Sequence, residues 1–285
     1  MASPESVPER FEAQLQAEDD ASTAIDLLAS ASPLSRQKLK QCMDKGGVWL
    51  NKARGGRRRI RRARTPLRKG DRLELHYDRF ILSSEPPVPR LIADRQAYSV
   101  WFKPENMLSQ GSKFADHCAI TRWVEKHHEP RRAVYLVHRL DRAASGLMLL
   151  AHDRKTAAKL SRLFAARAIR KCYRVEVAGE FDLALPLSIS TPLDGKDSET
   201  IVLSARPGEG SSMLTLEIKS GRKHQIRRHL SGLGWPVMGD RLYGGDDVRG
   251  ALKLTAHCLS FQCPVSGEAV TFRLDDSAGQ LIEQD

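Results

Sequence analysis

The chain has 285 residues, enough for two domains, and its hydrophobic (41%) and charged (28%) fractions are ordinary for a globular protein. Its 46 Lys and Arg residues against 35 Asp and Glu give a formal net charge of +11, which favours a polyanionic partner, most simply a nucleic acid. No apolar run reaches the length of about 18 residues that suggests a membrane-spanning helix. The first residues lack the basic and apolar segments of a secretory signal, so we expect a cytoplasmic protein without a membrane partner.

The five cysteines are scattered and form no CxxC pair, which indicates reduced thiols rather than a disulfide framework. Cys258, Cys263 and His257 come nearest to a zinc site, but their spacing is not that of a usual ligand set. The sequence contains no glycine-rich phosphate loop and no dinucleotide-binding motif. We therefore expect neither a metal nor a cofactor.

The first third of the chain divides into three segments. Residues 1–20 are acidic and poor in apolar side chains, and we expect a disordered lead-in. Residues 21–82 show the pattern of a small α/β domain, with two short helices followed by strands near 48–51 and 72–77. Residues 83–95 contain three prolines and are expected to form a semi-rigid linker.

A basic block lies between the two strands of this first domain. Ten of the eighteen residues from Lys52 to Lys69 are Lys or Arg, and none is acidic. A run of charge is often only a solvated face, but this density favours contact with nucleic-acid phosphates. The residues that we expect to contribute, together with the preceding helix, are Arg36, Lys40, Arg57, Arg58, Arg59, Arg61 and Arg62.

Three short segments of this region match a known pattern. They are Ser35-Arg36 at the start of a helix, Gly46-Gly47 before Val48-Trp49-Leu50-Asn51, and Lys69-Gly70-Asp71 before a hydrophobic strand. With them, residues 21–82 resemble the S4 RNA-binding domain. The resemblance implies that this domain binds RNA.

The second domain is expected over residues 96–285. Its predicted helices cover 116–128, 153–168 and 222–233, and its predicted strands cover 98–102, 171–178, 200–204, 212–219, 253–262 and 268–274. Strands outnumber helices and do not alternate regularly with them. This pattern favours an α+β fold with a mixed, largely antiparallel sheet.

Asp141 is the most informative residue of this domain. It lies in the segment His138-Arg139-Leu140-Asp141-Arg142-Ala143-Ala144-Ser145-Gly146-Leu147, between two arginines and two apolar stretches. A surface ion pair is the plainer interpretation. However, a carboxylate kept ionised by cations at the edge of a core is suited to act as a nucleophile or base.

Three later segments carry further chemistry. Tyr173 lies in the alternating strand 171–177, where on its own it would be taken for a core tyrosine. A basic, helix-like run begins at Gly221-Arg222-Lys223-His224-Gln225-Ile226-Arg227. The segment Gly239-Asp240-Arg241-Leu242-Tyr243-Gly244-Gly245 is rich in turn residues, and its glycines and aspartate are typical of structural turns.

Taken in order, these segments resemble the RluA-type pseudouridine synthases, a family that carries His-Arg-Leu-Asp, a strand Tyr, Gly-Arg-x-His-Gln-Ile-Arg and Gly-Asp-x-x-Tyr-Gly. The resemblance implies the pseudouridine synthase fold. It also implies that Asp141 is the nucleophile, that Tyr173 stacks on a flipped uracil and assists proton removal from C5, and that Arg227 pairs with Asp141. The residues that it places against RNA are Arg139, Arg222, His224 and Gln225.

The sequence therefore predicts a monomeric isomerase that converts uridine to pseudouridine in RNA, with large-subunit ribosomal RNA the first expected substrate and transfer RNA the second. A non-catalytic RNA-binding or ribosome-assembly protein on the same fold is the main alternative. A hydrolase or nuclease that uses Asp141 would require a second acid or a metal near it, and the sequence offers no clear candidate.

Overall fold

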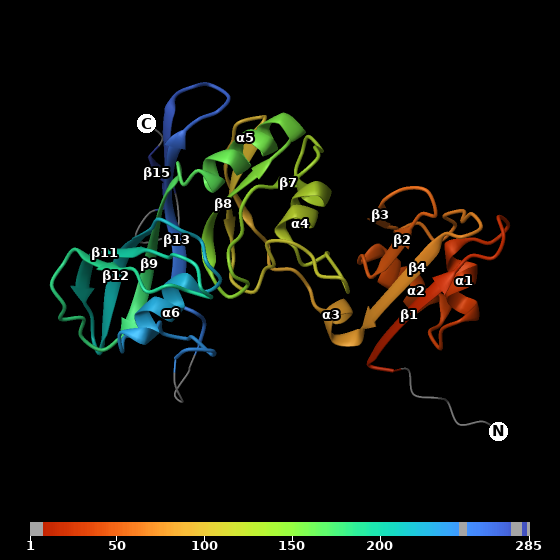
Figure 1. Ribbon diagram of the computed structural model, residues 1–285, viewed down its shortest axis with the longest axis horizontal. Coiled ribbons are helices and arrows are strands. Elements are labelled where there is room, and N and C mark those ends of the chain that lie inside the picture. The colour runs from red at the N-terminus through yellow and green to blue at the C-terminus, as the bar shows by residue number, and fades with distance from the viewer. Residues whose placement is uncertain (1–7, 245–249, 275–280, 284–285) are drawn as a thin grey trace. The chain divides into compact units, whose positions relative to one another are not determined.

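The computed structural model describes residues 8–244, 250–274 and 281–283. The chain divides into two compact units, and most of their helices and strands are labelled in Figure 1. The smaller, N-terminal unit comprises Met1–Pro86 and Gln110–Trp123, and the larger unit comprises Pro87–Ser109 and Val124–Asp285. Among the residues described, no helix combines the length and the apolar composition needed to span a bilayer.

The N-terminal unit is a four-stranded antiparallel sheet packed against short helices. Its elements are β1 (Arg10–Gln16), α1 (Ala24–Ser30), α2 (Arg36–Asp44), β2 (Val48–Asn51), β3 (Arg57–Arg59), β4 (Arg72–Asp78) and α3 (Arg79–Ser83). The strand order is β1-β4-β2-β3. Ser35 caps α2, because its hydroxyl accepts a hydrogen bond from the backbone N–H of Lys38. Leu28, Leu39 and Leu73 are fully buried in the core between helices and sheet.

The N-terminal segment differs from the expected disordered lead-in. Residues Arg10–Gln16 form β1, which pairs with β4 over its whole length. Phe11, Ala13 and Leu15 alternate with polar residues and pack against the core, so this strand has one apolar face. The sequence analysis missed this strand for two reasons. The segment is acidic, and its pairing partner, β4, lies more than fifty residues further along the chain.

The expected linker over residues 83–95 is shorter in the structure. α3 ends at Ser83, and β5 (Arg90–Asp94) already pairs with β6 (Tyr98–Lys103) in the larger unit. The expected second domain is also interrupted, because Gln110–Trp123 packs with the N-terminal unit. The backbone N–H of Asp116 donates to the carbonyl of Lys45, so α4 begins at Ile120 and not at residue 116.

The larger unit is built on an eleven-stranded mixed sheet, so the expected α+β class is confirmed. Its main strand order is β10-β11-β12-β9-β13-β8-β6-β5, and of its strand pairs only β8 and β13 run parallel among the residues described. The strands after β6 are β7 (Tyr135–Leu136), β8 (Ser145–Ala151), β9 (Arg170–Ala178), β10 (Leu187–Ile189), β11 (Thr200–Pro207), β12 (Ser211–Ile218), β13 (Leu254–Gln262), β14 (Ala269–Leu274) and β15 (Leu281–Glu283). The helices are α4 (Ile120–His127), which begins in the segment assigned to the N-terminal unit, α5 (Arg154–Ala165) and α6 (Gln225–Gly232).

Candidate active site

The loop that carries Asp141 is fixed on its N-terminal side by Ser109. The Ser109 hydroxyl donates to the carbonyl of Leu140 at 2.7 Å and accepts from the backbone N–H of the same residue at 3.0 Å. Ser109 is buried, so neither hydrogen bond is exchanged with water. The residue immediately before Asp141 is therefore held at both of its backbone polar groups.

The C-terminal side of the loop is fixed by the parallel pairing of β8 with β13. Gly146 lies opposite Ala256, and a Cβ atom on Gly146 would come within 2.3 Å of the Ala256 carbonyl oxygen. Its φ of +117° is also unfavourable for any other residue. Ser145 and Thr255 add a hydroxyl–hydroxyl hydrogen bond of 2.9 Å. The Ser-Gly pair of the sequence motif is thus required for packing. It places Asp141 shortly before the first residue of β8.

His138 connects the same loop to β8 and α5. Its Nε2 atom accepts a hydrogen bond from the backbone N–H of Leu149, and its ring stacks on Phe164 with a centroid distance of 4.3 Å. Burial lowers the pKa of His138 to about 3, so the imidazole is neutral at ordinary pH. The first residue of the motif therefore has a structural role.

Lys103, the last residue of β6, lies beside the loop. It is fully buried, and its ammonium donates to the carbonyls of Pro104 and Met107 at 2.9 Å and of Arg142 at 3.4 Å. Burial lowers the pKa of Lys103 to about 7, although Asp141 opposes that shift. Lys103 thus joins β6 to the residue that follows Asp141.

Arg227 contacts the Asp141 carboxylate and is itself held by a second acid. Its Nη1 atom lies 3.5 Å from Oδ2 of Asp141. Its Nε and Nη2 atoms donate to the two carboxylate oxygens of Asp240 at 2.7 and 2.6 Å. This bidentate pair leaves one guanidinium nitrogen directed at Asp141, so Asp240 sets the orientation of Arg227.

Asp240 is completely buried, and its charge is compensated from several sides. Its Oδ1 atom also accepts the backbone N–H groups of Leu242 and Tyr243. Burial opposes ionisation of Asp240, but Arg227 and these amides lower its pKa below the ordinary value. Sequence reasoning treated Gly239-Asp240 as a structural turn and missed this role. The available signal was the segment Gly239-Asp240-Arg241-Leu242-Tyr243-Gly244 itself, which is one of the segments that carry the family resemblance.

His224 lies on the other side of the carboxylate. It is the residue before α6 and has a left-handed backbone conformation, with φ of 53°. Its Nε2 atom is 3.9 Å from Oδ2 of Asp141, and its Nδ1 atom is 3.0 Å from the hydroxyl of Tyr243. Burial lowers the pKa of His224, while Asp141 acts in the opposite direction.

Tyr173 lies on β9, and its buried ring lines the same cavity as Asp141. Burial, and next the nearby Asp141 carboxylate, raise the pKa of the Tyr173 hydroxyl. The phenol is therefore protonated at neutral pH. The structure brings together Asp141, Tyr173 and Arg227, the three side chains that the sequence analysis assigned to catalysis.

The cavity has a volume of about 540 Å³ and lies entirely within the larger unit. Six cationic side chains line it, and Asp141 is the one acid among its lining residues: the cations are Arg139, Arg167, Lys171, Lys219, Arg222 and Arg227. A second cavity of about 370 Å³ shares Asp141, His224 and Arg227 with it. A cavity of this size accommodates a nucleotide, and its charge favours a polyanion.

The residues of this region expected to contact RNA fall into two groups. Arg139 is exposed, and Arg222 lines the cavity, with its Nε atom donating to the carbonyl of Asp197. Gln225 differs from expectation because it is buried and its amide is fully used inside the protein. Its oxygen accepts from Ser220 and from the backbone of Arg222, and its nitrogen donates to Glu199 and Thr200. Gln225 therefore shapes the start of α6 rather than offering a group to RNA.

The arginines of the block in the N-terminal unit fall into two groups, because successive side chains of an extended chain point to opposite sides. Arg57 pairs with Glu74 at 2.6 Å, and Arg61 pairs with Asp116 at 2.6 Å. Arg59 lies 3.4 Å from Asp116 and donates to the carbonyls of Gly46 and Ser112. These odd-numbered arginines are engaged within the unit, contrary to the expectation that the whole block faces RNA.

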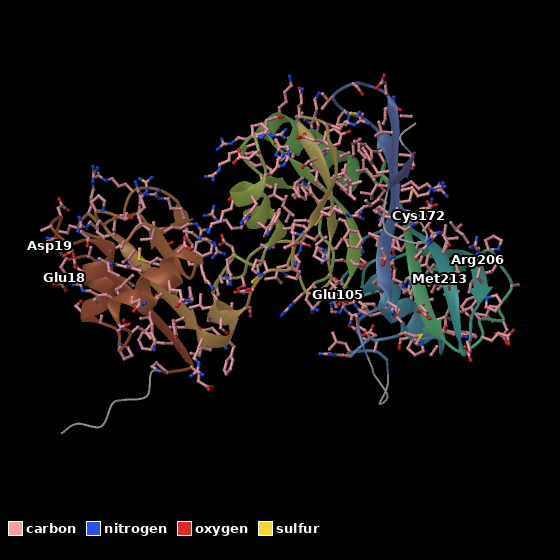
Figure 2. All side chains as sticks on the ribbon, turned by 180° about the vertical axis from the view of Figure 1, so that it is seen from behind. Glu18, Asp19, Glu105, Cys172, Arg206 and Met213 are labelled. Carbon is pink, nitrogen blue, oxygen red and sulfur yellow. The ribbon has the colours of Figure 1, made fainter. Side chains whose placement is uncertain are left out.

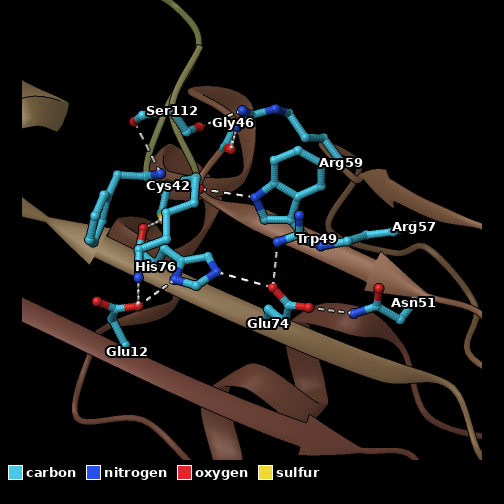
Figure 3. Close-up of polar contacts among 12 residues, drawn as sticks. Glu12, Cys42, Gly46, Trp49, Asn51, Arg57, Arg59, Glu74, His76 and Ser112 are labelled. Atoms are coloured by element: carbon cyan, nitrogen blue, oxygen red, sulfur yellow. Dashed lines mark hydrogen bonds and ion pairs between the residues drawn. The ribbon is translucent and has the colours of Figure 1, made fainter. Parts of the chain in front are cut away.

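Trp49 lies in the middle of this arrangement, as Figure 3 shows. The guanidinium carbons of Arg57 and Arg59 lie 4.0 and 4.1 Å from the centroid of its ring. Its indole N–H donates to the carbonyl of Lys113 at 2.9 Å. The arginines thus stack on an aromatic surface and bind the segment that includes Lys113 to the sheet of the N-terminal unit.

The remaining arginines of the block face solvent. Arg58 and Arg62 are exposed, and the structure gives neither a partner among the residues that it describes. Lys40 on α2 is likewise exposed, whereas Arg36 pairs with Asp26 at 2.9 Å in an exposed ion pair of little strength. Of the cations of the N-terminal unit that were expected to bind RNA, Lys40, Arg58 and Arg62 are therefore the ones best placed to do so.

Within the described part of the chain, no group of three or more His, Cys, Asp or Glu side chains is arranged to hold a metal ion. Cys258, which the sequence analysis considered as a ligand, instead lies opposite Cys172 on the neighbouring strand β9. All five cysteines are free thiols in the structure.

Comparison with known proteins gives a consistent result. The family model described as RNA pseudouridylate synthase matches residues 97–232. The dual-specificity RNA pseudouridine synthase RluA of Vibrio parahaemolyticus is 32% identical over 186 residues, which cover 58% of this chain and 74% of that protein. The RluA of Escherichia coli O157:H7 is 29% identical over 191 residues, covering 60% of this chain and 85% of the relative.

Two further similarities concern a tRNA enzyme and the fold. The tRNA pseudouridine synthase C of Pectobacterium carotovorum is 30% identical over 176 residues, covering 49% of this chain and 46% of that protein. The solved structure of human RNA pseudouridylate synthase domain containing 1 superposes with a TM-score of 0.55 at 22% identity, covering 68% of this chain and 86% of the human chain. At this identity the structural likeness shows a shared fold.

Proposed function

Because this chain belongs to the RluA-type family of RNA pseudouridine synthases, we propose that it isomerises uridine in structured RNA by covalent catalysis through Asp141, after the target nucleotide has been flipped out of its stack. Pseudouridine synthases are isomerases that convert uridine to pseudouridine in RNA, so the chain is an isomerase whose substrate is RNA. The single observation that carries the assignment of Asp141 is its contact with Arg227 at a cavity that Tyr173 also lines.

The reaction exchanges one glycosidic bond for another. The bond between N1 of uracil and C1′ of ribose breaks, the bond between C5 and C1′ forms, C5 loses its proton and N1 gains one. An Asp141 oxygen bonded to the sugar carbon or to the base holds the fragments together while the base turns, and the carboxylate is regenerated when the new bond forms. No electron is gained or lost, and the overall composition of the RNA is unchanged.

Arg227 and Asp240 supply the electrostatics of this step. The Arg227 guanidinium places a positive charge beside the carboxylate of Asp141, while Asp240 prevents Arg227 from turning to form a closed bidentate pair with Asp141. Asp141 therefore keeps a lone pair available for the substrate.

Tyr173 contributes its ring and a protonated hydroxyl. Its buried side chain on β9 offers a flat surface on which a flipped uracil can stack. Since its pKa is raised, the hydroxyl enters the reaction as a hydrogen-bond donor rather than as a phenolate base. This refines the expectation that Tyr173 assists proton removal from C5.

For the RNA we propose large-subunit ribosomal RNA first and transfer RNA second, with the S4-like N-terminal unit supplying phosphate contacts through Lys40, Arg58 and Arg62. The relatives include a protein named dual-specificity RNA pseudouridine synthase and one named tRNA pseudouridine synthase, which supports more than one class of RNA as a candidate substrate. Mapping of pseudouridines in total RNA from a deletion strain identifies the substrate. Loss of a site from transfer RNA alone would reverse the order proposed here.

The test of the catalytic assignment is the Asp141→Ala variant. We expect it to abolish tritium release from RNA labelled at C5 of uridine, while RNA binding, measured by filter retention, stays near that of the wild type. Asp194→Asn is the control, because Asp194 is an exposed aspartate that pairs with Arg228 on the same helix as Arg227, and Asn tolerates its left-handed backbone. Tritium release by Asp141→Ala at the wild-type rate would remove the assignment.

A further inference from the structure

Lys171 is a buried lysine that the proposed reaction does not use. Its side chain lies on β9 and lines the larger cavity, with only 9% of the residue exposed. Among the residues described, no carboxylate and no hydrogen-bond acceptor pairs with its ammonium. The ammonium is not one of the fully buried polar atoms, so it is accessible from the cavity that Lys171 lines. A cation at a cavity wall that no internal carboxylate neutralises is available to an anionic ligand.

The charges nearest to Lys171 are mostly of its own sign. Burial lowers its pKa, Arg167 and Lys219 act in the same direction, and Glu217 opposes them. Glu217 is already engaged by Arg170 at 2.9 Å and by Lys219. The cations Arg167, Arg170, Lys171 and Lys219 thus face the single carboxylate of Glu217, and the cluster keeps a net positive charge.

The position of Lys171 on its strand relates it to the reacting base. Residues two apart on a strand point to the same face and are separated by about 6.8 Å. Lys171 and Tyr173 stand in this relation, with Cys172, which Figure 2 labels on β9, between them. Both line the cavity, and Arg167 and Lys219 line its wall beside Lys171. A base stacked on Tyr173 would thus have its own backbone within reach of Lys171.

We propose that Lys171, together with Arg167 and Lys219, forms a subsite for an RNA backbone phosphate that flanks the flipped uridine. The inference rests on the proposed function, since it takes the cavity as the place of the flipped nucleotide. The phosphate supplies the counter-charge that Lys171 lacks, and the two more exposed cations contact its outer oxygens. The subsite thereby fixes the sugar of the target nucleotide relative to Asp141.

A hydrogen bond from Lys171 to a uracil carbonyl is the competing arrangement. One donor suffices for a neutral carbonyl, whereas three neighbouring cations match an anion with several oxygens. An adjoining hollow of about 350 Å³ shares Arg167 and Lys219 with the cavity and is lined in addition by Arg170 and by Glu217, the acid that pairs with Arg170 and Lys219. Three cations against one acid continue the positive wall beyond the cavity. Continuity of this kind suits a backbone that passes through the site.

The experiment compares two oligonucleotides in the Asp141→Ala background, where no product forms. The probes are pentauridylate with its natural phosphodiester linkages and pentauridylate with neutral methylphosphonate linkages. We expect Lys171→Met to raise the Kd for the phosphodiester probe about tenfold and to lower the slope of log affinity against log salt by about 0.7. Its effect on the neutral probe is expected to stay below about twofold. The exposed Lys155→Met on α5 is the matched control and should change neither Kd.

Equal weakening of both probes by Lys171→Met would assign Lys171 to the base or to the fold, and no weakening of either would leave it without a role in binding. Both outcomes overturn the subsite. Because Lys171→Met can fail to fold, the wild-type chain provides a second measurement, the rate of reductive methylation of Lys171 followed by mass spectrometry. We expect the phosphodiester probe, and more weakly inorganic phosphate, to protect Lys171 while the neutral probe does not.

Neither measurement depends on turnover. Failure of wild-type tritium release with intact protection of Lys171 would contradict the proposed function and leave the phosphate subsite standing. Protection by both probes alike would contradict the subsite and leave the catalytic assignment standing.

Discussion

The active-site cavity and the arginine block of the N-terminal unit are both dense in cations, but their arginines are held in different ways. In the cavity, Asp240 takes two nitrogens of Arg227 and leaves the third for Asp141. In the block, Glu74 and Asp116 engage every second arginine and leave the others in solvent. Whether an arginine is available to a ligand or stabilises the fold therefore depends on the acid that it faces, and not on the local density of positive charge.

The largest expected effect is that of removing Asp240. Asp240→Ala leaves the buried Arg227 charge without its partner, which should lower the free energy of unfolding by about 3–5 kcal/mol. Released from its bidentate pair, Arg227 no longer holds its place beside Asp141, and kcat should fall about 100-fold. Chemical denaturation and tritium release measure the two effects.

The exposed pair of Asp194 with Arg228, the residue after Arg227 on α6, is the control for this prediction. Asp194→Asn removes the charge, tolerates the left-handed backbone of residue 194 and should cost less than about 1 kcal/mol. If Asp240→Ala were as stable and as active as Asp194→Asn, the orientation of Arg227 by Asp240 would be excluded.

The next prediction compares the exposed arginines of the arginine block with those that are paired within the N-terminal unit. A double Arg58→Ala, Arg62→Ala variant should lose about tenfold in RNA affinity and lower the salt slope by about 1 to 2, because two phosphate contacts disappear. Arg57→Ala, Arg61→Ala should lower the thermal stability of the N-terminal unit and change the salt slope less. Substitution is preferable to deletion of residues 1–82, because Gln110–Trp123 packs with that unit.

Equal salt slopes for the two double variants would show that the exposed arginines do not contribute more to RNA binding than the arginines that are paired within the unit. Circular dichroism melting and filter binding over a series of salt concentrations provide the two readouts.

A smaller effect is expected from Ser109→Ala. The variant removes both hydrogen bonds to the backbone of Leu140, at a cost of about 1–2 kcal/mol, and loosens the residue before Asp141. We expect a severalfold decrease in kcat with little change in KM. Ser109→Thr retains the hydroxyl and should recover activity. A change in KM alone would place Ser109 in substrate binding instead.

The smallest effect concerns pH and the N-terminal unit. Hydrogen bonding by Arg57 lowers the pKa of Glu74 to about 2 from its ordinary value of 4.5. The folded carboxylate is thus charged where the unfolded one takes up a proton, so its contribution to stability is complete above pH 4.5 and is lost as the pH falls towards 2. In Arg57→Ala, the stability of the N-terminal unit, measured by acid-induced unfolding and tryptophan fluorescence, should depend less on pH between 4.5 and about 2. An unchanged pH dependence of stability would rule out the Arg57–Glu74 pair as its source.

Much of the larger unit followed from local patterns. Alternation of apolar and polar residues predicts β9, β12 and β13 within a few residues, because a strand with one buried face repeats every two positions. The arginine block hid β3, because charged residues on both sides of a short strand mask its period. β1 does alternate, but it lies in a segment whose acidic composition suggested disorder. Pairing with β2 and β4 then supplies the hydrogen bonds that composition did not suggest.

By itself, the sequence determined the class of fold and the family, and it predicted Asp141, Tyr173 and Arg227 as a set, because residue types and their spacing are local and survive folding. Only the tertiary structure decided which group each of them faces. Asp240 lies 13 residues from Arg227, Ser109 lies 31 from Leu140, and Asp116 lies 55 from Arg61. Contacts between such distant residues depend on how the strands pair, and the pairing of a whole sheet is a property that no single segment carries.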